Sequence, residues 1–147
     1  MNQNRIPFSS FNKGAMPVLR KIMQVTQQRH ELIANNIANA ETPNYQAQDI
    51  DESGFMKALD KAVEKRRAGN PRRWEFGRSR TVEETKLGSL RLRTQASTRL
   101  DSLDHGQNNV DIDMEMAKLA ENTMSHNMMV EMLAKQYKML ESAIAER

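Results

Sequence analysis

The residues best suited to chemistry are three histidines, His30, His105 and His126. His30 and Glu31 begin like the helical zinc-binding motif of metalloproteases, in which a second histidine lies four positions after the first. That position holds Ala34, so the second ligand is missing. The histidines have no neighbours at ligand spacing, and two of them fall on apolar helix faces. The sequence therefore favours packing or partner contacts over metal binding.

The rest of the chain suggests no reactive site. It contains no Gly-rich phosphate-binding loop and no nucleophile elbow, and its lack of cysteine excludes disulfides and thiol chemistry. The acidic residues fall in loops or on the solvent-facing sides of predicted helices, where they form no catalytic pair. We therefore predict a protein that is not an enzyme, with no catalytic residue, no cofactor, no metal and no small-molecule substrate.

The middle of the chain is strongly basic. Residues 52–100 carry thirteen Lys/Arg against six Asp/Glu, and arginines recur between Arg66 and Arg80 with Trp74 and Phe76 among them. Such a segment could bind phosphates and stack on bases, so a nucleic-acid or acidic-surface binding module is the alternative function. No recognised nucleic-acid-binding fold surrounds the segment, and we favour a solvated charge run with no nucleic-acid partner.

The overall composition suits a helical chain. Its 147 residues fit one domain, with 5% aromatic and 28% charged residues and a mean hydropathy of −0.76. Apolar runs stay well short of the ~18 residues of a membrane span. The first twelve residues lack the apolar region of a secretory signal peptide, so we expect no cleaved signal.

The first predicted helix covers residues 13–40. Thr42 precedes a proline and is disfavoured in the α region, so the helix should end near Ala40 or Glu41. Apolar and small residues recur at alternating spacings of three and four, which is typical of a coiled-coil-like face. This face consists of Met16, Leu19, Met23, Thr26, His30, Ile33, Ile37 and Ala40.

The second and stronger predicted helix covers residues 111–145, with Asp111 or Asp113 as its N-terminal cap. At 1.5 Å per residue it is on the order of 50 Å long, too long to bury its apolar face alone. We expect that face, here called the predicted seam, to pack on the first helix, on other copies, or on both. The predicted seam consists of Ile112, Met116, Leu119, Thr123, His126, Val130, Leu133, Tyr137, Leu140 and Ile144.

Methionines spread around this second helix beyond one face. Flexible thioethers suit contacts with several non-identical partners, and we favour this interpretation over gap-filling in a core because one partner helix cannot cover every face. Seven of the eleven methionines lie here: Met114, Met116, Met124, Met128, Met129, Met132 and Met139.

The region between the helices has weaker signals. A short helix is indicated around Phe55–Val63, and alternation at Leu90 and Leu92 predicts a short strand. The stretch Lys65–Arg73 should break any helix and form a mobile loop. The simplest arrangement pairs the two terminal helices antiparallel and loops out this middle region.

These elements give a mainly α fold. We expect two long terminal amphipathic helices in an antiparallel coiled-coil-like pair, with a poorly ordered middle region that holds a short helix or β-hairpin. The predicted divisions are a flexible leader (1–12), the N-terminal helix with its exit turn (13–51), a variable basic insert (52–100) and the C-terminal helix (101–147).

Two segments resemble a known family. Residues 34–45, Ala-Asn-Asn-Ile-Ala-Asn-Ala-Glu-Thr-Pro-Asn-Tyr, resemble the Ala-Asn-Asn-Ile-Ala-Asn-x-x-Thr-Pro-x-Tyr motif of bacterial flagellar rod, hook and related axial proteins. The family often has glycine before the tyrosine, and Asn44 stands here, which also tolerates left-handed geometry. Residues 108–122 and 139–144 resemble one rod member of the family more than its other rod members.

The resemblance implies a structural subunit of the proximal rod of the flagellar basal body, which assembles through its terminal helices and transmits torque. It implies a periplasmic rod location, reached through the flagellar type III export apparatus. The implied partners are copies of the chain, other flagellar rod proteins, the adaptor between the rod and the membrane ring, and the export apparatus.

We predict that the subunit contacts come from residues 34–45, here called the exit motif, and from the two helices. Asn35, Asn36 and Asn39 should hydrogen-bond across subunits or fix the exit turn. Ile33, Ile37, Leu119, Val130, Leu133, Tyr137 and Leu140 should pack the helix pair. The full predicted contact set is Ile33, Asn35, Asn36, Ile37, Asn39, Thr42, Pro43, Tyr45, Asn109, Val110, Met116, Leu119, Asn122, Val130, Leu133, Tyr137, Leu140 and Ile144.

Overall fold

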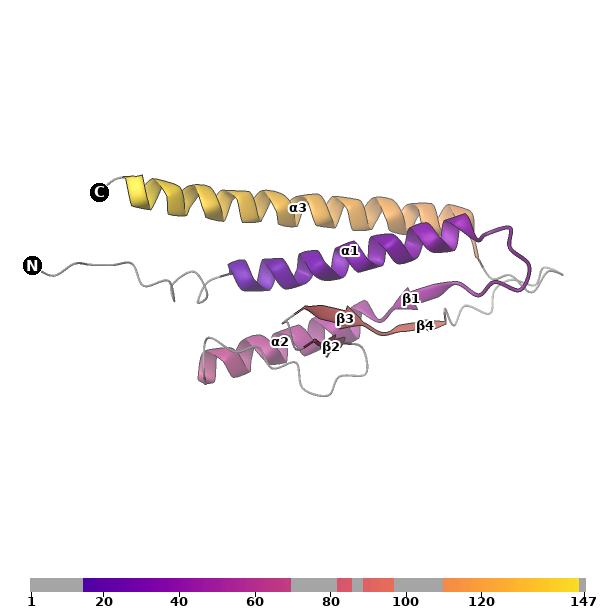
Figure 1. Ribbon diagram of the computed structural model, residues 1–147, viewed down its shortest axis with the longest axis horizontal. Coiled ribbons are helices and arrows are strands. Elements are labelled where there is room, and N and C mark those ends of the chain that lie inside the picture. The colour runs from indigo at the N-terminus through magenta and orange to yellow at the C-terminus, as the bar shows by residue number, and fades with distance from the viewer. Residues whose placement is uncertain (1–14, 70–81, 86–88, 97–109, 146–147) are drawn as a thin grey trace, which may run out of the picture.

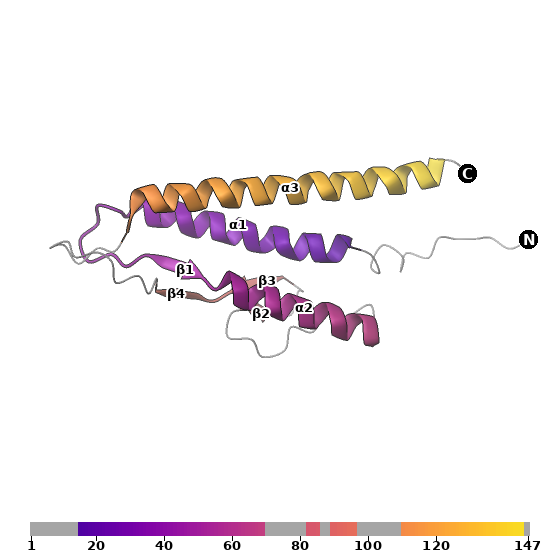
Figure 2. The same ribbon diagram turned by 180° about the vertical axis from the view of Figure 1, so that it is seen from behind.

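The computed structural model describes residues 15–69, 82–85, 89–96 and 110–145 as three elongated layers, with one helix in the middle (Figure 1). The described elements in chain order are α1 (Met16–Ala38), β1 (Gln48–Ile50), α2 (Glu52–Ala68), β2 (Val82–Glu84), β3 (Leu90–Leu92), β4 (Thr94–Ala96) and α3 (Ile112–Ala145). α3 runs antiparallel to α1 on one side, and α2 with the strands covers the other side of α1 (Figures 1 and 2).

The two long helices confirm the main predictions of the sequence. α1 has a proline in its first turn, where a missing N–H leaves no intrahelical bond unmade, and it ends at Ala38, two residues before the predicted end. α3 begins one residue after Asp111, whose carboxylate accepts a hydrogen bond from the N–H of Met114 at 3.1 Å. Of the two N-terminal caps that the sequence allowed, Asp111 and Asp113, the structure therefore has Asp111.

α2 begins at a similar cap. The Asp51 carboxylate accepts hydrogen bonds from the N–H of Gly54 at 2.8 Å and the hydroxyl of Ser53 at 2.9 Å. These bonds, that from Gly54 first, lower the pKa of Asp51 below its ordinary value of 3.8. The predicted short helix is thus confirmed. The stretch 65–73 was predicted to break it, and α2 includes the first four residues of that stretch before it ends at Ala68. Basic side chains in this last turn favour the negative end of the helix dipole. The predicted mobile loop from residue 70 lies outside the described residues.

Four short strands form two antiparallel pairs, β1 with β4 and β2 with β3. The predicted strand at Leu90 and Leu92 is β3, with Val82 of β2 opposite Leu92. The side chain of Gln28, on α1, donates to the carbonyl of Leu90 at 2.6 Å and accepts from the N–H of Leu92 at 3.0 Å. Gln24 accepts from the N–H of Leu90 at 3.4 Å. Two α1 side chains therefore bond the edge of β3 as a further strand would.

The hydrophobic core lies between α1 and the layer of α2 and strands. Phe55 and Ala62 of α2 are fully buried there, beneath Val25 of α1. Burial of these side chains supplies the main apolar stabilisation of the fold. The buried cluster consists of Val25, Ile50, Phe55, Leu59, Ala62, Val82, Leu90 and Leu92.

The mainly α fold with an antiparallel pair of terminal helices is confirmed. The expectation that the middle region loops away from this pair is wrong for its described parts, because α2, β2 and β3 form the core with α1. Within the described residues, the helices are too polar or too short to cross a bilayer.

Candidate functional site

The most unusual surface of the molecule is one flank of α3. Val130 is 41% exposed and Met116 53% exposed, although both belong to the predicted seam. We call this flank the outward stripe. It consists of Ile112, Met116, Leu119, Thr123 and Val130, all exposed except the half-buried Leu119. A shallow groove of about 670 Å³ extends from its first half around α3 to Met128, lined by Met116, Leu119, Ala120, Thr123, Met124, Asn127, Met128 and Glu131.

A second apolar flank lies on the opposite side of α3. At about 100° per residue, its members fall roughly 180° from the outward stripe. This methionine flank consists of Met114, Met128, Met132 and Met139, each between 36% and 48% exposed. The prediction that α3 carries apolar surface on more than one side is confirmed, and contacts with several partners stay a prediction.

The face of α3 that touches α1 is more polar than the flanks. The only side chains of α3 that are buried, within its described residues, are those of Glu115 and Asn122. Apolar residues on this face, Met129, Leu133 and Leu140, are half-buried. The predicted seam is therefore rotated: Val130 does not pack between the helices, and the prediction that it does so is wrong for the single chain.

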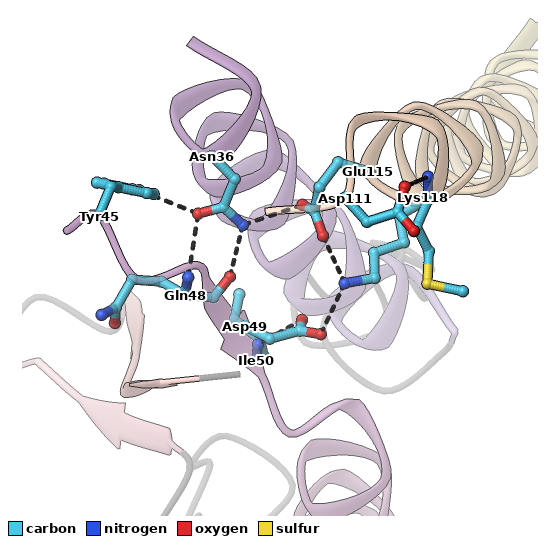
Figure 3. A network of polar contacts seen from close by, with 9 residues as sticks. Asn36, Tyr45, Gln48, Asp49, Ile50, Asp111, Glu115 and Lys118 are labelled. Atoms are coloured by element: carbon cyan, nitrogen blue, oxygen red, sulfur yellow. Dashed lines mark hydrogen bonds and ion pairs between the residues drawn. The ribbon is translucent and has the colours of Figure 1, made fainter. Parts of the chain in front are cut away.

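Asn36 is the centre of the contact between α1 and α3 (Figure 3). Its side chain, 1% exposed, donates to the Gln48 carbonyl at 2.7 Å and to Glu115 at 2.9 Å. Its amide oxygen accepts from the Tyr45 hydroxyl and from the Gln48 N–H, both at 3.0 Å. All four hydrogen-bonding positions of this amide are used, so its orientation is fixed.

Glu115 extends the contact to β1. Its buried carboxylate accepts from Lys118 at 2.6 Å, and Lys118 also reaches Asp49 at 3.3 Å (Figure 3). Desolvation lowers the pKa of Lys118, but the hydrogen bond to Glu115 and the charges of Asp49 and Glu115 outweigh it and leave this pKa above the ordinary 10.5. We call Asn36, Glu115, Lys118 and Asp49 the polar network. It joins α1, β1 and the start of α3.

A second polar contact lies further along the helix pair. Asn122 donates to the main-chain carbonyl of Thr26 at 2.9 Å, while its own amide oxygen is buried without a partner. The Thr26 hydroxyl lies 3.1 Å from the carbonyl of Met23, to which it can donate, and shares a hydrogen bond of 2.9 Å with Nδ1 of His126. His126 thus contacts the partner helix, as the sequence favoured. Tyr137 reaches α1 through Arg20, whose guanidinium donates to its hydroxyl.

The exit from α1 is held by the asparagines of the motif. Asn39 is the C-cap, and its side chain donates to the Asn35 carbonyl at 2.8 Å and to the Asn35 side chain at 3.0 Å. Asn44, which precedes the tyrosine of the motif where the family often has glycine, has a left-handed backbone with φ 60°. Asn36 and Asn39 therefore hold the exit turn within the chain, and hydrogen bonds of Asn35, Asn36 and Asn39 across subunits stay a prediction.

The other predicted contact residues divide between exposed and covered positions. Ile33 is buried, while Thr42, Pro43 and Ile144 are exposed. Half-buried positions are Ile37, Tyr45, Val110, Leu119, Leu133 and Leu140. Asn109 lies outside the described residues, as do His105 and the arginines from Arg72 to Arg80.

Sequence reasoning missed Glu115, Lys118 and Asp49. One signal could have indicated Glu115, namely its spacing. It lies seven residues before Asn122, so the two polar residues lie on the same face of the helix. In the described segments, no three carboxylate or histidine side chains gather as a metal site would require.

Comparison with known proteins identifies relatives. Residues 23–46 match the family described as flagella basal body rod protein. Over most of its length the chain is similar to curated proteins named flagellar basal body rod protein FlgB. It is 33% identical over 138 residues to the protein of Salmonella typhimurium, and the match covers 85% of this chain and 88% of the relative. The identity to the Escherichia coli protein is 31% over 136 residues, with the same coverage of both chains. The identity to the Bacillus subtilis protein is 25% over 135 residues, covering 92% of this chain and 96% of the relative.

Proposed function

The chain belongs to the FlgB family of flagellar basal body rod proteins, and we propose that this structural component of the rod assembles through the two apolar flanks of α3. One observation carries the proposal. The core of the subunit lies on the far side of α1, so the apolar side chains of the outward stripe are not needed to fold the chain. Contiguous exposed apolar surface of this kind marks interaction sites.

We propose that the occupants are copies of this chain and other rod proteins. The two flanks lie on different sides of α3, so one subunit can contact two neighbours with different surfaces. Contacts between unlike surfaces generate a helical assembly when the rotation between neighbours does not close into a ring, and we propose that this is the case here. The adaptor that joins the rod to the membrane ring would contact the subunits at the base of such an assembly.

Torque transmission requires stiff contacts and no chemistry. We propose that α3 supplies stiffness as a single helix of 34 residues that α1, the polar network and neighbouring subunits hold along its length. The site in the cell would be the periplasmic rod, reached through the flagellar type III export apparatus. The predicted contact residues of the exit motif, Thr42 and Pro43, would touch a neighbour from the end of the helix pair.

Crosslinking in basal bodies tests the proposal. A photoreactive amino acid replaces Val130 in the outward stripe, and in a matched control it replaces Lys138, an exposed charged residue between the two flanks of the same helix. We expect adducts of position 130 with copies of the chain or other rod proteins, and fewer from position 138. Assembled basal bodies that give no adduct from position 130 would contradict assembly through this flank.

A further inference from the structure

α3 does not present its most apolar face to α1. The outward stripe holds five members of the predicted seam, and the face that contacts α1 contains the buried Glu115 and Asn122 instead. At about 100° per residue, a rotation of α3 by roughly 80° about its own axis would turn the outward stripe onto α1. Burial of apolar area favours that rotation, so another interaction must oppose it.

The polar network opposes the rotation at the start of α3. Turning the helix would carry Glu115 away from Asn36 and break the 2.9 Å hydrogen bond between them. The Asn36 amide would stay buried with one N–H unbonded, because Gln48 and Tyr45 occupy its other positions. A buried polar group without a partner costs more free energy than its hydrogen bond supplies.

A second opposing contact lies near the middle of α3. Asn122 donates to the Thr26 carbonyl, and Nδ1 of His126 shares a hydrogen bond with the Thr26 hydroxyl. Both bonds would break on rotation. The amide oxygen of Asn122 is buried without a hydrogen-bond partner, which costs free energy. The chain therefore adopts the observed orientation of α3 although this orientation leaves one buried polar atom unbonded. Buried polar residues in helix pairs can determine which arrangement forms while lowering stability.

We propose that the Asn36–Glu115 hydrogen bond, supported by Asn122 and Thr26, sets the rotation of α3 and keeps the outward stripe from packing on the subunit's own α1. Asn36 and Glu115 are positioning residues in this role. The inference rests on the proposed function only in taking neighbouring subunits as the occupants of the stripe. The rotation itself is a property of the single chain and is measured there.

The absence of cysteine makes a direct measurement possible. Met129 is half-buried against α1 and Val130 is exposed, so single Met129→Cys and Val130→Cys reporters lie on different sides of one helix turn. In the isolated full chain at about pH 8, where thiols react readily, the thiol at position 130 should react faster with a thiol reagent than the thiol at position 129.

Asn36→Asp tests the hydrogen bond in both reporter backgrounds. It places a second carboxylate against Glu115, and like charges at this distance repel. We expect α3 to rotate and the order of the two labelling rates to invert. Adding Glu115→Gln should shift the order back toward that of the parent, because the glutamine amide donates to the new carboxylate at position 36. The Gln48 carbonyl, which Asn36 bonds at 2.7 Å, still lacks its donor in this double variant. Leu140→Ala is the control: it weakens the contact face outside the polar network and should raise both rates without inverting their order.

Three results would overturn the inference: equal labelling rates in the parent reporters, an unchanged order in Asn36→Asp, or a rise in both rates with no inversion. None of them depends on assembly. If the labelling rates show that the polar network does not set the rotation of α3, position 130 can still give crosslinks in basal bodies. The failure of this inference is therefore distinguishable from the failure of the proposed function.

Discussion

Asn36 and Glu115 lie 79 residues apart in the chain, and their buried side chains share a hydrogen bond of 2.9 Å. This contact joins the end of the first long helix to the start of the last. The exit motif and the C-terminal segment, which the sequence identified separately, therefore meet in one place. A change at either residue should be felt in both segments.

Replacing Asn36 with alanine should lower the free energy of unfolding by about 1–3 kcal/mol, because the Gln48 carbonyl and the buried Glu115 carboxylate lose their donor. Urea denaturation followed by circular dichroism measures the change. Asn35→Ala is the control at an exposed neighbouring position and should stay within about 0.5 kcal/mol of the parent. Equal losses in the two variants would contradict a special role for the buried amide.

The position of the core predicts unequal effects of two truncations. Phe55→Ala removes a side chain that is 1% exposed and should cost about 3–5 kcal/mol. Leu133→Ala removes a half-buried side chain between α1 and α3 and should cost about 1–2 kcal/mol in the isolated chain. The same urea titrations test both. A larger effect of Leu133→Ala would mean that the helix pair, and not the α2 layer, supplies the core.

Val130→Asp should separate stability from assembly. The side chain is 41% exposed, so the free energy of unfolding should change by no more than about 0.5 kcal/mol. A carboxylate in an apolar subunit contact has no compensating partner, so swimming motility should be lost. Lys138→Asp introduces the same residue between the two flanks of α3 and should leave cells motile. Motile Val130→Asp cells would argue against the outward stripe as a contact surface.

The cap of α2 predicts a dependence of stability on pH. The pKa of Asp51 lies below its ordinary 3.8, chiefly through the bond from the Gly54 N–H. A lowered folded-state pKa stabilises the fold above pH 3.8, and the contribution disappears as the pH falls through the folded-state value. Asp51→Asn, which caps without a charge, should therefore be less stable than the parent at neutral pH and approach it in acid. Urea titrations across this range measure the difference, and a constant difference would contradict the assignment.

Local signals in the sequence predicted the local structure well. The cap at Asp111, the left-handed backbone at Asn44 and the strand at Leu90 each depend on neighbouring residues, and each is present. The rotation of α3 was not predictable in the same way. A heptad pattern ranks positions by hydrophobicity, and it cannot distinguish an apolar residue that faces the chain's own helix from one that faces outward.

The candidate site depends on contacts that no local pattern contains. Glu115 reads as an ordinary acidic residue in a first helical turn, yet it is 3% exposed because Asn36 and Lys118 satisfy its carboxylate. The extension of α2 through Lys65–Ala68 was missed because a run of basic residues suggested a loop. Tertiary packing buries Arg66 of that run and overrides the local preference.

The glutamines at the margin of the β2–β3 hairpin have a consequence for aggregation. Gln24 and Gln28 occupy main-chain groups of Leu90 and Leu92 that would otherwise be available to a strand from a stray molecule. Unprotected strand margins promote amyloid-like growth, which has no fixed end and no correct geometry. In the assembly proposed above, where subunits would gather at high local concentration, the chain's own side chains close this second route of polymerisation.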